Sequence, residues 1–304
     1  MKYILSSLLA IIEKKLSTTF KDATLCRQYA WWLLQAITQK SELELITTQE
    51  IDWTDYQQAQ LDDALDKLIN QNMPLAYLLG SMPFAGLDIL VHPPILIPRS
   101  ETEEWVCNLI DQMQPARNEP LTILDLCTGS GCIALAFADA FPKAQVYATD
   151  INESALELAK QNAKHNQISN VTFLHSNLFD TIPKDLKFDL IVANPPYIPE
   201  QEWATLEPSV KNWEDKHALI APDQGMALIK KIIDYAPAYL KPNDLLKKNN
   251  IPQLAIEIDA TQGAALSTYL KNHGYTQVTV AKDLEGKDRV ATGRVDHVAS
   301  PTHS

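Results

Sequence analysis

The chain has 304 residues, of which 46% are hydrophobic and 21% are charged, a composition typical of a globular protein that folds in water. This length exceeds what one ordinary core needs, so two domains are expected. The net charge of −12 disfavours a protein that holds bare nucleic acid by phosphate contacts. The cysteines form no CxxC pair, so they are interpreted as reduced thiols of a cytoplasmic protein without a disulfide frame or a metal site: Cys26, Cys107, Cys127 and Cys132.

Residues 1–80 carry helical periodicity, and no glycine occurs before Gly80. The opening "MKYILSSLLAIIEKKL" could be a secretion signal, but its apolar run is short and no small-x-small cleavage site follows. It is interpreted as a helix with one apolar side made of Ile4, Leu8, Ile11, Ile12 and Leu16. No stretch is long enough to cross a membrane. The region is predicted to be a bundle of four or five helices with Trp31 and Trp32 in its core.

Residues 81–99 change character, because "HPP" cannot be helical and apolar residues flank it. A β-hairpin or extended connector between two domains is predicted. Ser100 and Glu103 then fit a capping box at the start of a helix. Near the C-terminus, 241–252 is predicted to be a polar loop and 296–304 a frayed tail.

From residue 100 to 295 a second domain is predicted. Its fold class is α/β, because apolar strands alternate with amphipathic helices, which indicates a mainly parallel sheet covered on both faces. The last two strands are joined by "DLEGKD", which is too short for a helical crossover, so they should pair antiparallel. The predicted strands are 122–126, 145–150, 171–175, 188–194, 253–258, 277–282 and 289–294, and the predicted helices are 132–141, 154–166, 225–240 and 263–273.

A glycine-rich turn joins a strand to a helix in "ILDLCTGSGCIALAFA" (123–138). Gly129 and Gly131 let the backbone approach a ligand closely, although such a turn can also be purely structural. It is neither a phosphate loop nor a complete dinucleotide fingerprint. The next strand ends in Asp150, whose carboxylate could accept both hydroxyls of a ribose or could only cap the following helix. Taken together, the two features favour a nucleoside ligand.

The fourth strand of this domain ends in "NPPY" (194–197). Prolines stop strands and Asn-Pro opens turns, so the bland interpretation is a turn. The chemical interpretation is that prolines leave carbonyl groups free and fix their direction, which builds a rigid hydrogen-bond acceptor.

With these blocks in order, "IPRSETE", "DLCTGSG", "NPPYI" and "DLEGKDR" behind a helical domain, nearly the whole chain resembles the peptide-chain-release-factor glutamine methyltransferases. The resemblance implies a Rossmann-like, seven-stranded class I methyltransferase sheet. It also implies transfer of a methyl group from S-adenosyl-L-methionine, with S-adenosyl-L-homocysteine as product and no metal. The substrate of that family is the side-chain amide nitrogen of the Gln in the Gly-Gly-Gln motif of a release factor. This chain departs from the family pattern at Cys127, at Asn177, at "WEDKHAL" and at "KPNDLLKKNN".

The resemblance also implies roles for individual residues. The turn under the methionine part of the cofactor would be Cys127, Thr128, Gly129, Ser130 and Gly131. Asp150 would take the ribose hydroxyls, Asn177 and Leu178 would edge the adenine, and Asp125 would help to hold the amino group. Thr102 and Glu103 would close the methionine end. Substrate binding and catalysis would fall to Asn194, Pro195, Pro196 and Tyr197, with Asn194 also beside the cofactor.

An amide nitrogen is a poor nucleophile, because its lone pair is delocalised into the carbonyl. If the side-chain oxygen of Asn194 and the carbonyl of Pro195 accept its two N–H bonds, the nitrogen is held with its free face toward the methyl donor. Both acceptors strengthen as positive charge develops on nitrogen. Pro196 would stiffen the loop, and Tyr197 would lie against the planar amide.

Other readings stay open from the sequence. Glutamine methylation of a ribosomal protein shares much of the motif pattern, and adenine or guanine nucleic-acid methyltransferases share NPPY. A non-catalytic binding protein that kept the fold is disfavoured by the intact motifs. The stretch 202–219 is either a solvated loop and helix or a lid. We expect a cytoplasmic monomer whose partner is a release factor, with no direct nucleic-acid or membrane partner.

Overall fold

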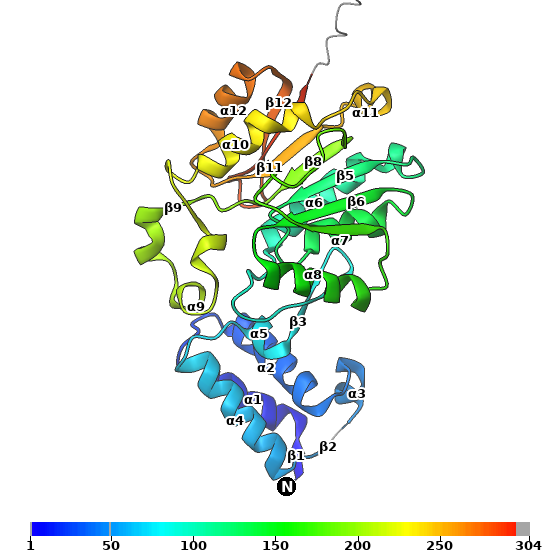
Figure 1. The fold of residues 1–304 in the computed structure, drawn as a ribbon. Coiled ribbons are helices and arrows are strands. Elements are labelled where there is room, and N and C mark those ends of the chain that lie inside the picture. Colours follow the sequence, from blue (N-terminus) through cyan, green and yellow to red (C-terminus); the bar gives the residue numbers. More distant parts are fainter. Residues whose placement is uncertain (1, 49, 296–304) are drawn as a thin grey trace, which may run out of the picture. The chain divides into compact units, whose positions relative to one another are not determined.

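The computed structural model describes residues 2–48 and 50–295, which form two compact units (Figure 1). One unit comprises residues 2–81 together with 207–213, and the other comprises 82–206 together with 214–295. The predicted frayed tail, 296–304, lies outside the described residues. No helix in 2–48 or 50–295 combines the length and the apolar character that a membrane crossing requires.

The first unit is a helical bundle, as predicted. Three of its helices begin after residues whose side chains accept the free N–H groups of the first turn: Asp22 before α2, Ser41 before α3 and Thr54 before α4. Leucine and isoleucine side chains from α1, α2 and α4 fill its core. The helices are α1 (Leu5–Leu16), α2 (Ala23–Thr38), α3 (Glu42–Thr47), α4 (Asp55–Ile69), α5 (Leu75–Leu79) and α9 (Pro208–Lys211).

Three details of this bundle differ from the prediction. The N-terminal helix begins at Leu5, because strand β1 (Lys2–Ile4) pairs antiparallel with β2 (Glu50–Asp52). Ile4, in this strand, and Ile11, in the helix, are exposed at 60% and 43% rather than part of a buried side. Trp31 packs against the core as predicted, but Trp32 is 39% exposed. Helical periodicity could not reveal β1, because its pairing partner lies almost fifty residues away.

The second unit contains a β-hairpin and an α/β sheet. The predicted connector forms the hairpin of β3 (Ser81–Phe84) and β4 (Leu87–Leu90). The other strands are β5 (Thr122–Leu126), β6 (Gln145–Asp150), β7 (Val171–His175), β8 (Leu190–Ala193), β9 (Ile198–Pro199), β10 (Ile220–Ala221), β11 (Leu254–Glu257), β12 (Tyr275–Lys282) and β13 (Asp288–Val295). Its helices are α6 (Ser100–Gln112), α7 (Cys132–Ala140), α8 (Glu153–His165), α10 (Ala227–Tyr235), α11 (Asp244–Lys248) and α12 (Gly263–Asn272), with short 3-10 turns at Gln114–Ala116, Glu200–Thr205, Lys216–Ala218 and Ala236–Ala238.

The seven-stranded sheet has the order β12-β13-β11-β8-β5-β6-β7. Its central strands are parallel, and β13 runs antiparallel to both β11 and β12, which confirms the prediction for the last two strands. Because β5 leads to β6 on one side and has β8 on the other, the strand order reverses between β5 and β8. In open α/β sheets such a reversal leaves a crevice for a ligand beyond the carboxyl ends of the strands.

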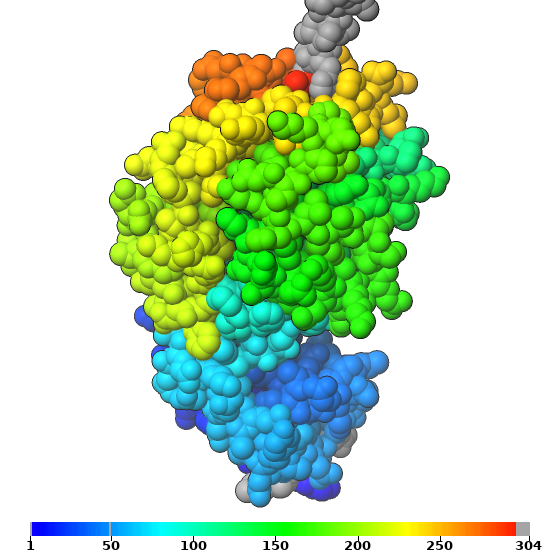
Figure 2. Space-filling view, viewed as in Figure 1, coloured from blue at the N-terminus to red at the C-terminus, as the bar shows by residue number. Residues whose placement is uncertain are grey.

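Helices cover both faces of this sheet (Figure 1). Helices α10 and α12 bury Ile229, Ile232 and Leu266 against Leu124 and Ile256 of the strands. Their yellow and orange side chains close over this face in the space-filling view (Figure 2). Residues alternate along a strand, so Asp125 and Glu257 point to the opposite face, which α6 and α7 cover.

Two local predictions for this unit were wrong. Ser100 does not cap α6: the N-cap is Arg99, and the carboxylate of Glu103 instead accepts the backbone N–H of Ala85 in the hairpin at 2.8 Å. The polar stretch 241–252 is not all loop, because α11 forms within it behind the N-cap Asn243. The partner of Glu103 lies 18 residues away, where local spacing could not indicate it, whereas α11 is held by a local cap in which Asn243 accepts the N–H of Leu246.

Candidate active site

The predicted site residues meet because of the sheet register. Ala193 of β8 pairs with Leu126 of β5 and with Ile256 of β11, and Leu126 also pairs with Thr149 of β6. One residue further along each strand comes a row of polar positions. From β11 to β6 it reads Glu257, Asn194, Cys127 and Asp150. The NPPY motif and the glycine turn therefore begin level with each other at the carboxyl edge of the sheet.

The glycine turn is shaped for close approach. Cys127, Gly129 and Gly131 all have positive φ, at 60°, 55° and 85°. A Cβ built on Gly129 would meet no atom within 4 Å, so the space above this backbone is open. On Gly131 it would lie 2.9 Å from the Cβ of Ala159, so this glycine lets α8 pack against the turn. The first glycine thus leaves room for a ligand, and the second serves packing.

Asp125 is fully buried beneath this turn. One carboxylate oxygen, Oδ2, accepts the Thr128 hydroxyl at 2.6 Å and the N–H of Ala134 at 3.1 Å. The other oxygen, Oδ1, has no hydrogen-bond partner among the described residues. Burial raises the pKa of Asp125 from 3.8 to about 7, against the effect of these hydrogen bonds. A buried carboxylate with an unused oxygen suits a cationic group such as an ammonium.

Asp150 accepts two backbone N–H groups, that of Gly129 at 2.9 Å and that of Asn152 at 2.8 Å. It does not cap α8, because the N-cap is Asn152, whose side chain accepts from Ser154 and Ala155. The purely capping interpretation of Asp150 is therefore wrong. Burial raises the pKa of this carboxyl as well, while both hydrogen bonds oppose the rise. Each carboxylate oxygen of Asp150 has a second lone pair, which remains available to accept a hydrogen bond from a ribose hydroxyl.

Asn177 and Leu178 lie just beyond the end of β7. Leu178 adopts a positive φ of 51°, which turns the chain sharply there. Both residues line a small cavity of about 130 Å³, together with Phe179, Asp180, Lys231 and Tyr235. This position, beyond the third strand of the parallel set, is compatible with the edge of an adenine ring.

The NPPY segment presents acceptors and few donors. Pro195 and Pro196 are buried and have no N–H, and no hydrogen bond to the Pro195 carbonyl occurs among the described residues. Asn194 is half-buried, and its amide nitrogen Nδ2 donates to the Thr102 hydroxyl at 3.2 Å. That bond leaves the side-chain oxygen of Asn194 as an acceptor for another molecule.

The structure also shows what supports this segment. The amide of Gln262 donates to the carbonyl oxygens of Tyr197 and Gln224, both at 3.0 Å. Gly225 packs so closely that an added Cβ would lie 1.8 Å from the Tyr197 carbonyl oxygen. The Tyr197 hydroxyl donates to Glu257 at 3.1 Å. Glu257, Gln262 and Gly225 were all missed in the sequence. Only Glu257 carried a signal, as a charged residue inside the apolar run "LAIEI".

Of the two residues predicted to close the methionine end, Thr102 lies at the site and Glu103 turns elsewhere. Thr102 is 1% exposed and touches Asn194 through its hydroxyl. The Glu103 carboxylate faces the hairpin, as described above. The structure thus brings together the glycine turn, Asp125, Asp150, Asn194 and Thr102, while the position of Glu103 favours a structural role.

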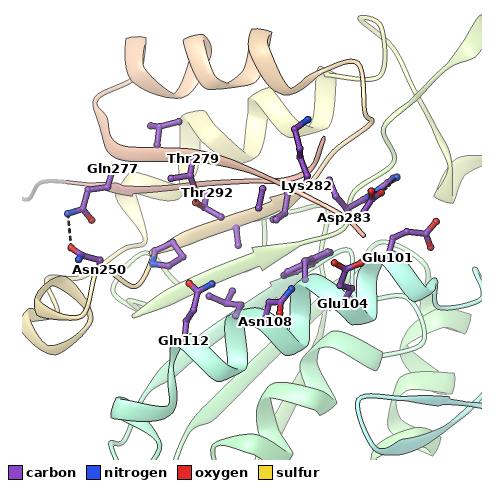
Figure 3. A pocket seen from close by; sticks show the side chains of 18 of the residues that line it. Glu101, Glu104, Asn108, Gln112, Asn250, Gln277, Thr279, Lys282, Asp283 and Thr292 are labelled. Atoms are coloured by element: carbon purple, nitrogen blue, oxygen red, sulfur yellow. Dashed lines mark hydrogen bonds and ion pairs between the residues drawn. The ribbon is translucent and has the colours of Figure 1, made fainter. Parts of the chain in front are cut away.

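A separate cavity of about 660 Å³ lies between α6 and the strands β12 and β13 (Figure 3). Glu104, Asn108 and Gln112 of α6 face Thr279 and Thr292 of the strands across it, and Gln277 bonds Asn250 at its rim. None of the predicted site residues lines it. Trp105 stands in its wall and donates its indole N–H to Glu257 at 2.8 Å, so this side chain separates the cavity from the buried carboxylate.

Comparisons with known proteins agree with this geometry. The family described as Methyltransferase small domain matches residues 106–207, and the PrmC N-terminal domain family matches residues 14–80. The release factor glutamine methyltransferase of Salmonella typhimurium is 36% identical over 274 residues, which are 90% of this chain and 94% of the relative. The chain belongs to the release factor glutamine methyltransferase family.

Further members of the release factor glutamine methyltransferase family show how far the likeness extends. The relative from Coxiella burnetii is 33% identical and matches over 93% of this chain and 96% of its own length. The relative from Fusobacterium nucleatum is 41% identical over 71% of this chain, and that match spans 58% of the relative's length. Among solved structures, the hMettl16 catalytic domain in complex with MAT2A 3'UTR hairpin 6 superposes with a TM-score of 0.54 at 16% identity, covering 90% of this chain and 95% of that one. This last likeness concerns the fold.

Proposed function

We propose that this protein transfers a methyl group from S-adenosyl-L-methionine to the side-chain amide nitrogen of the glutamine in the Gly-Gly-Gln motif of a peptide chain release factor. The observation that carries the proposal is the position of the acceptors: the oxygens of Asn194 and Pro195, which accept no hydrogen bond from the described part of the chain, stand level with the glycine turn at the strand-order reversal. Membership of the family, whose relatives carry this activity in their names, supports the substrate.

The residues present fit the cofactor. The open space above Gly129 would accommodate the methionine chain, and the Asp125 oxygen that has no partner among the described residues would supply a counter-charge for its ammonium group. Asp150 would accept the ribose hydroxyls, and Asn177 with Leu178 would edge the adenine. When bound, the cofactor supplies a methyl group activated by a neighbouring sulfonium charge.

The protein's own contribution is orientation and charge. The amide oxygen of Asn194 and the carbonyl of Pro195 accept the two N–H bonds of the substrate amide, which leaves the nitrogen lone pair facing the methyl donor. Holding two reacting atoms about 3–3.5 Å apart in line can supply several kcal/mol. Both acceptors bind the nitrogen more strongly once it carries positive charge. The nitrogen sheds one proton after the new bond forms, so the site needs fixed acceptors rather than a strong base.

Tyr197 is half-buried; its ring hydroxyl donates to Glu257, and its backbone carbonyl accepts from Gln262. A ring held at its hydroxyl, on a backbone that is itself held, is suited to lie against a planar amide. The acidic chain, with its net charge of −12, favours a protein substrate over bare nucleic acid. We propose a monomeric cytoplasmic enzyme in which the helical unit contributes to recognition of the release factor.

The substrate is tested by a transfer assay with radiolabelled cofactor. A release factor, its Gln-to-Ala variant in the Gly-Gly-Gln motif, a ribosomal protein and DNA are offered in parallel. We expect label only on the unaltered release factor. Label on the Gln-to-Ala variant, or on the ribosomal protein or DNA alone, would reject the proposed substrate.

The role of Asn194 is tested by Asn194→Ala. Loss of one preorganised acceptor in such a site costs roughly 100- to 1000-fold in kcat. We expect that loss together with cofactor affinity close to that of the wild type in calorimetry. The matched control is Asn118→Ala in an exposed turn, which should leave both quantities unchanged. A large loss of cofactor affinity in Asn194→Ala would contradict the role assigned here.

A further inference from the structure

Glu257 is a buried carboxylate for which the proposed chemistry has no direct use. It stands at the end of β11, is 1% exposed and lies level with Asn194 across the sheet. Three side chains donate hydrogen bonds to it: Thr102 at 2.6 Å and Trp105 at 2.8 Å to Oε2, and Tyr197 at 3.1 Å to Oε1. Two of these donors, Thr102 and Tyr197, themselves touch or belong to the NPPY segment.

The hydrogen bond from Thr102 to Glu257 determines which end of the Asn194 amide faces Thr102. A threonine hydroxyl has one proton, and the Thr102 proton points to the carboxylate of Glu257, which can only accept when ionised. The Thr102 oxygen is therefore left as an acceptor toward Asn194. Asn194 therefore donates from its amide nitrogen to the Thr102 oxygen, at 3.2 Å, and its amide oxygen points away from Thr102.

If the Asn194 side-chain amide were rotated by 180°, its NH₂ group would face the NH₂ group of the substrate amide. Two N–H groups facing each other cannot bond, and each would lose its hydrogen bond in a partly buried site. The direction of the Asn194 amide thus decides whether the site can accept a primary amide at all. Nothing in Asn194 itself sets that direction, because its two ends are nearly equal in size and shape.

We propose that Glu257 is a positioning residue: through the Thr102 hydroxyl it fixes the Asn194 side chain with its oxygen toward the substrate, and through the Tyr197 hydroxyl it fixes the ring beside it. This inference deepens the proposed function and rests on it. Trp105 completes the arrangement, because it lines the cavity beside α6 and donates its indole N–H to the same carboxylate. A carboxylate bonded in this way keeps its direction toward the three donors.

The decisive comparison is Thr102→Val against Thr102→Ser. Valine keeps the shape of threonine and removes the hydroxyl, whereas serine keeps the hydroxyl and removes a methyl group. We expect Thr102→Val to lower kcat about 10- to 100-fold, as displacement of an orienting contact does, with KM for the release factor within about threefold. Thr102→Ser should restore kcat to within about threefold of the wild type. Equal losses in both variants would show that packing of α6 alone matters and would overturn the proposal.

A third variant separates direction from charge. In Glu257→Gln the new side-chain oxygen can take over both bonds at Oε2, from Thr102 and from Trp105, and the new amide group can donate to the Tyr197 oxygen. We therefore expect kcat within about fivefold of the wild type, since Asn194 stays oriented. A loss as large as that of Thr102→Val would overturn the proposal, because the negative charge would then be the active feature.

A spectroscopic measurement tests the inference even if the release factor is not the substrate. In protein labelled with ¹⁵N-asparagine, the Asn194 side-chain amide signals are identified by their absence in Asn194→Ala. One of its two protons should shift on Thr102→Val and keep its position in Thr102→Ser. Unchanged signals in Thr102→Val would refute the orientation of Asn194. If the wild type transfers no methyl group to a release factor while these shifts occur as expected, the proposed function fails and the positioning role stands.

Discussion

The support behind the NPPY segment offers a sharp test, because it lies at Gly225, about thirty residues further along the chain. Gly225 has a φ of +80°, and an added Cβ would lie 1.8 Å from the Tyr197 carbonyl oxygen and 2.6 Å from its carbon. Ordinary contact begins at 3.4 Å, so in Gly225→Ala these two atoms must separate by 3.4 − 1.8 = 1.6 Å. The obstacle is backbone, which cannot rotate away as a side chain can.

Two effects combine in Gly225→Ala, and a matched variant separates them. The left-handed backbone costs an alanine roughly 1–2 kcal/mol wherever it occurs. Gly274 has almost the same φ, +83°, and no atom within 4 Å of an added Cβ, so Gly274→Ala carries that cost alone. The clash at Gly225 should add about 1–3 kcal/mol of overpacking to the loss of unfolding free energy. A shift of about 1 Å in the acceptor loop should lower kcat about 100-fold.

Both variants are measured by urea unfolding and by methyl transfer at saturating cofactor. We expect Gly274→Ala to keep the wild-type kcat within about twofold, because its strain lies in an exposed turn remote from the NPPY segment. Gly225→Ala should lose both more stability and most of its turnover. If its unfolding free energy matches that of Gly274→Ala and its kcat stays near the wild type, the NPPY loop is not held by this contact.

Four further predictions concern the cofactor side and the packing of α8 behind it. Asp150→Ala should raise the cofactor Kd by at least about 30-fold through lost ribose hydrogen bonds, and unaltered affinity in calorimetry would remove it from the site. With a pKa of about 7, Asp125 is mostly protonated at pH 6, so binding of a cationic amino group there should release up to about one proton, seen as buffer-dependent binding heats and absent in Asp125→Asn. Because the folded-state pKa lies above the ordinary 3.8, the protonated carboxyl stabilises the fold at low pH and this contribution is lost as pH rises through about 7. Burial raises the pKa of Asp150 and Glu257 as well, so Asp125→Asn should reduce the slope of unfolding free energy against pH without removing it, and an unchanged slope would refute the contribution of Asp125. Gly131→Ala should destabilise by about 2–3 kcal/mol, and Ala159→Gly in the same chain should recover part of that loss, since the new Cβ lies 2.9 Å from that of Ala159; simple additivity of the two substitutions would refute the contact.

Much of the fold could be predicted because it is written in short-range patterns. Apolar runs such as "TILDL" and "LIVA" are strands in the structure, and helical periodicity located α7, α8 and α12 within one or two residues. The antiparallel end of the sheet followed from the length of one connection. The glycine turn and NPPY stood out because glycine and proline restrict the backbone locally, whatever the rest of the chain does.

The sequence by itself determined which strands, turns and polar strand ends exist, because hydrophobic period and backbone-restricting residues act over a few positions. Only the tertiary structure decided which of those ends support one another. Thr102 meets Glu257 across 155 positions, Tyr197 meets Gln262 across 65, and β1 finds β2 across 48. Such partners are selected by sheet register and by which side chain can satisfy a buried donor or acceptor, and neither quantity can be read from spacing along the chain.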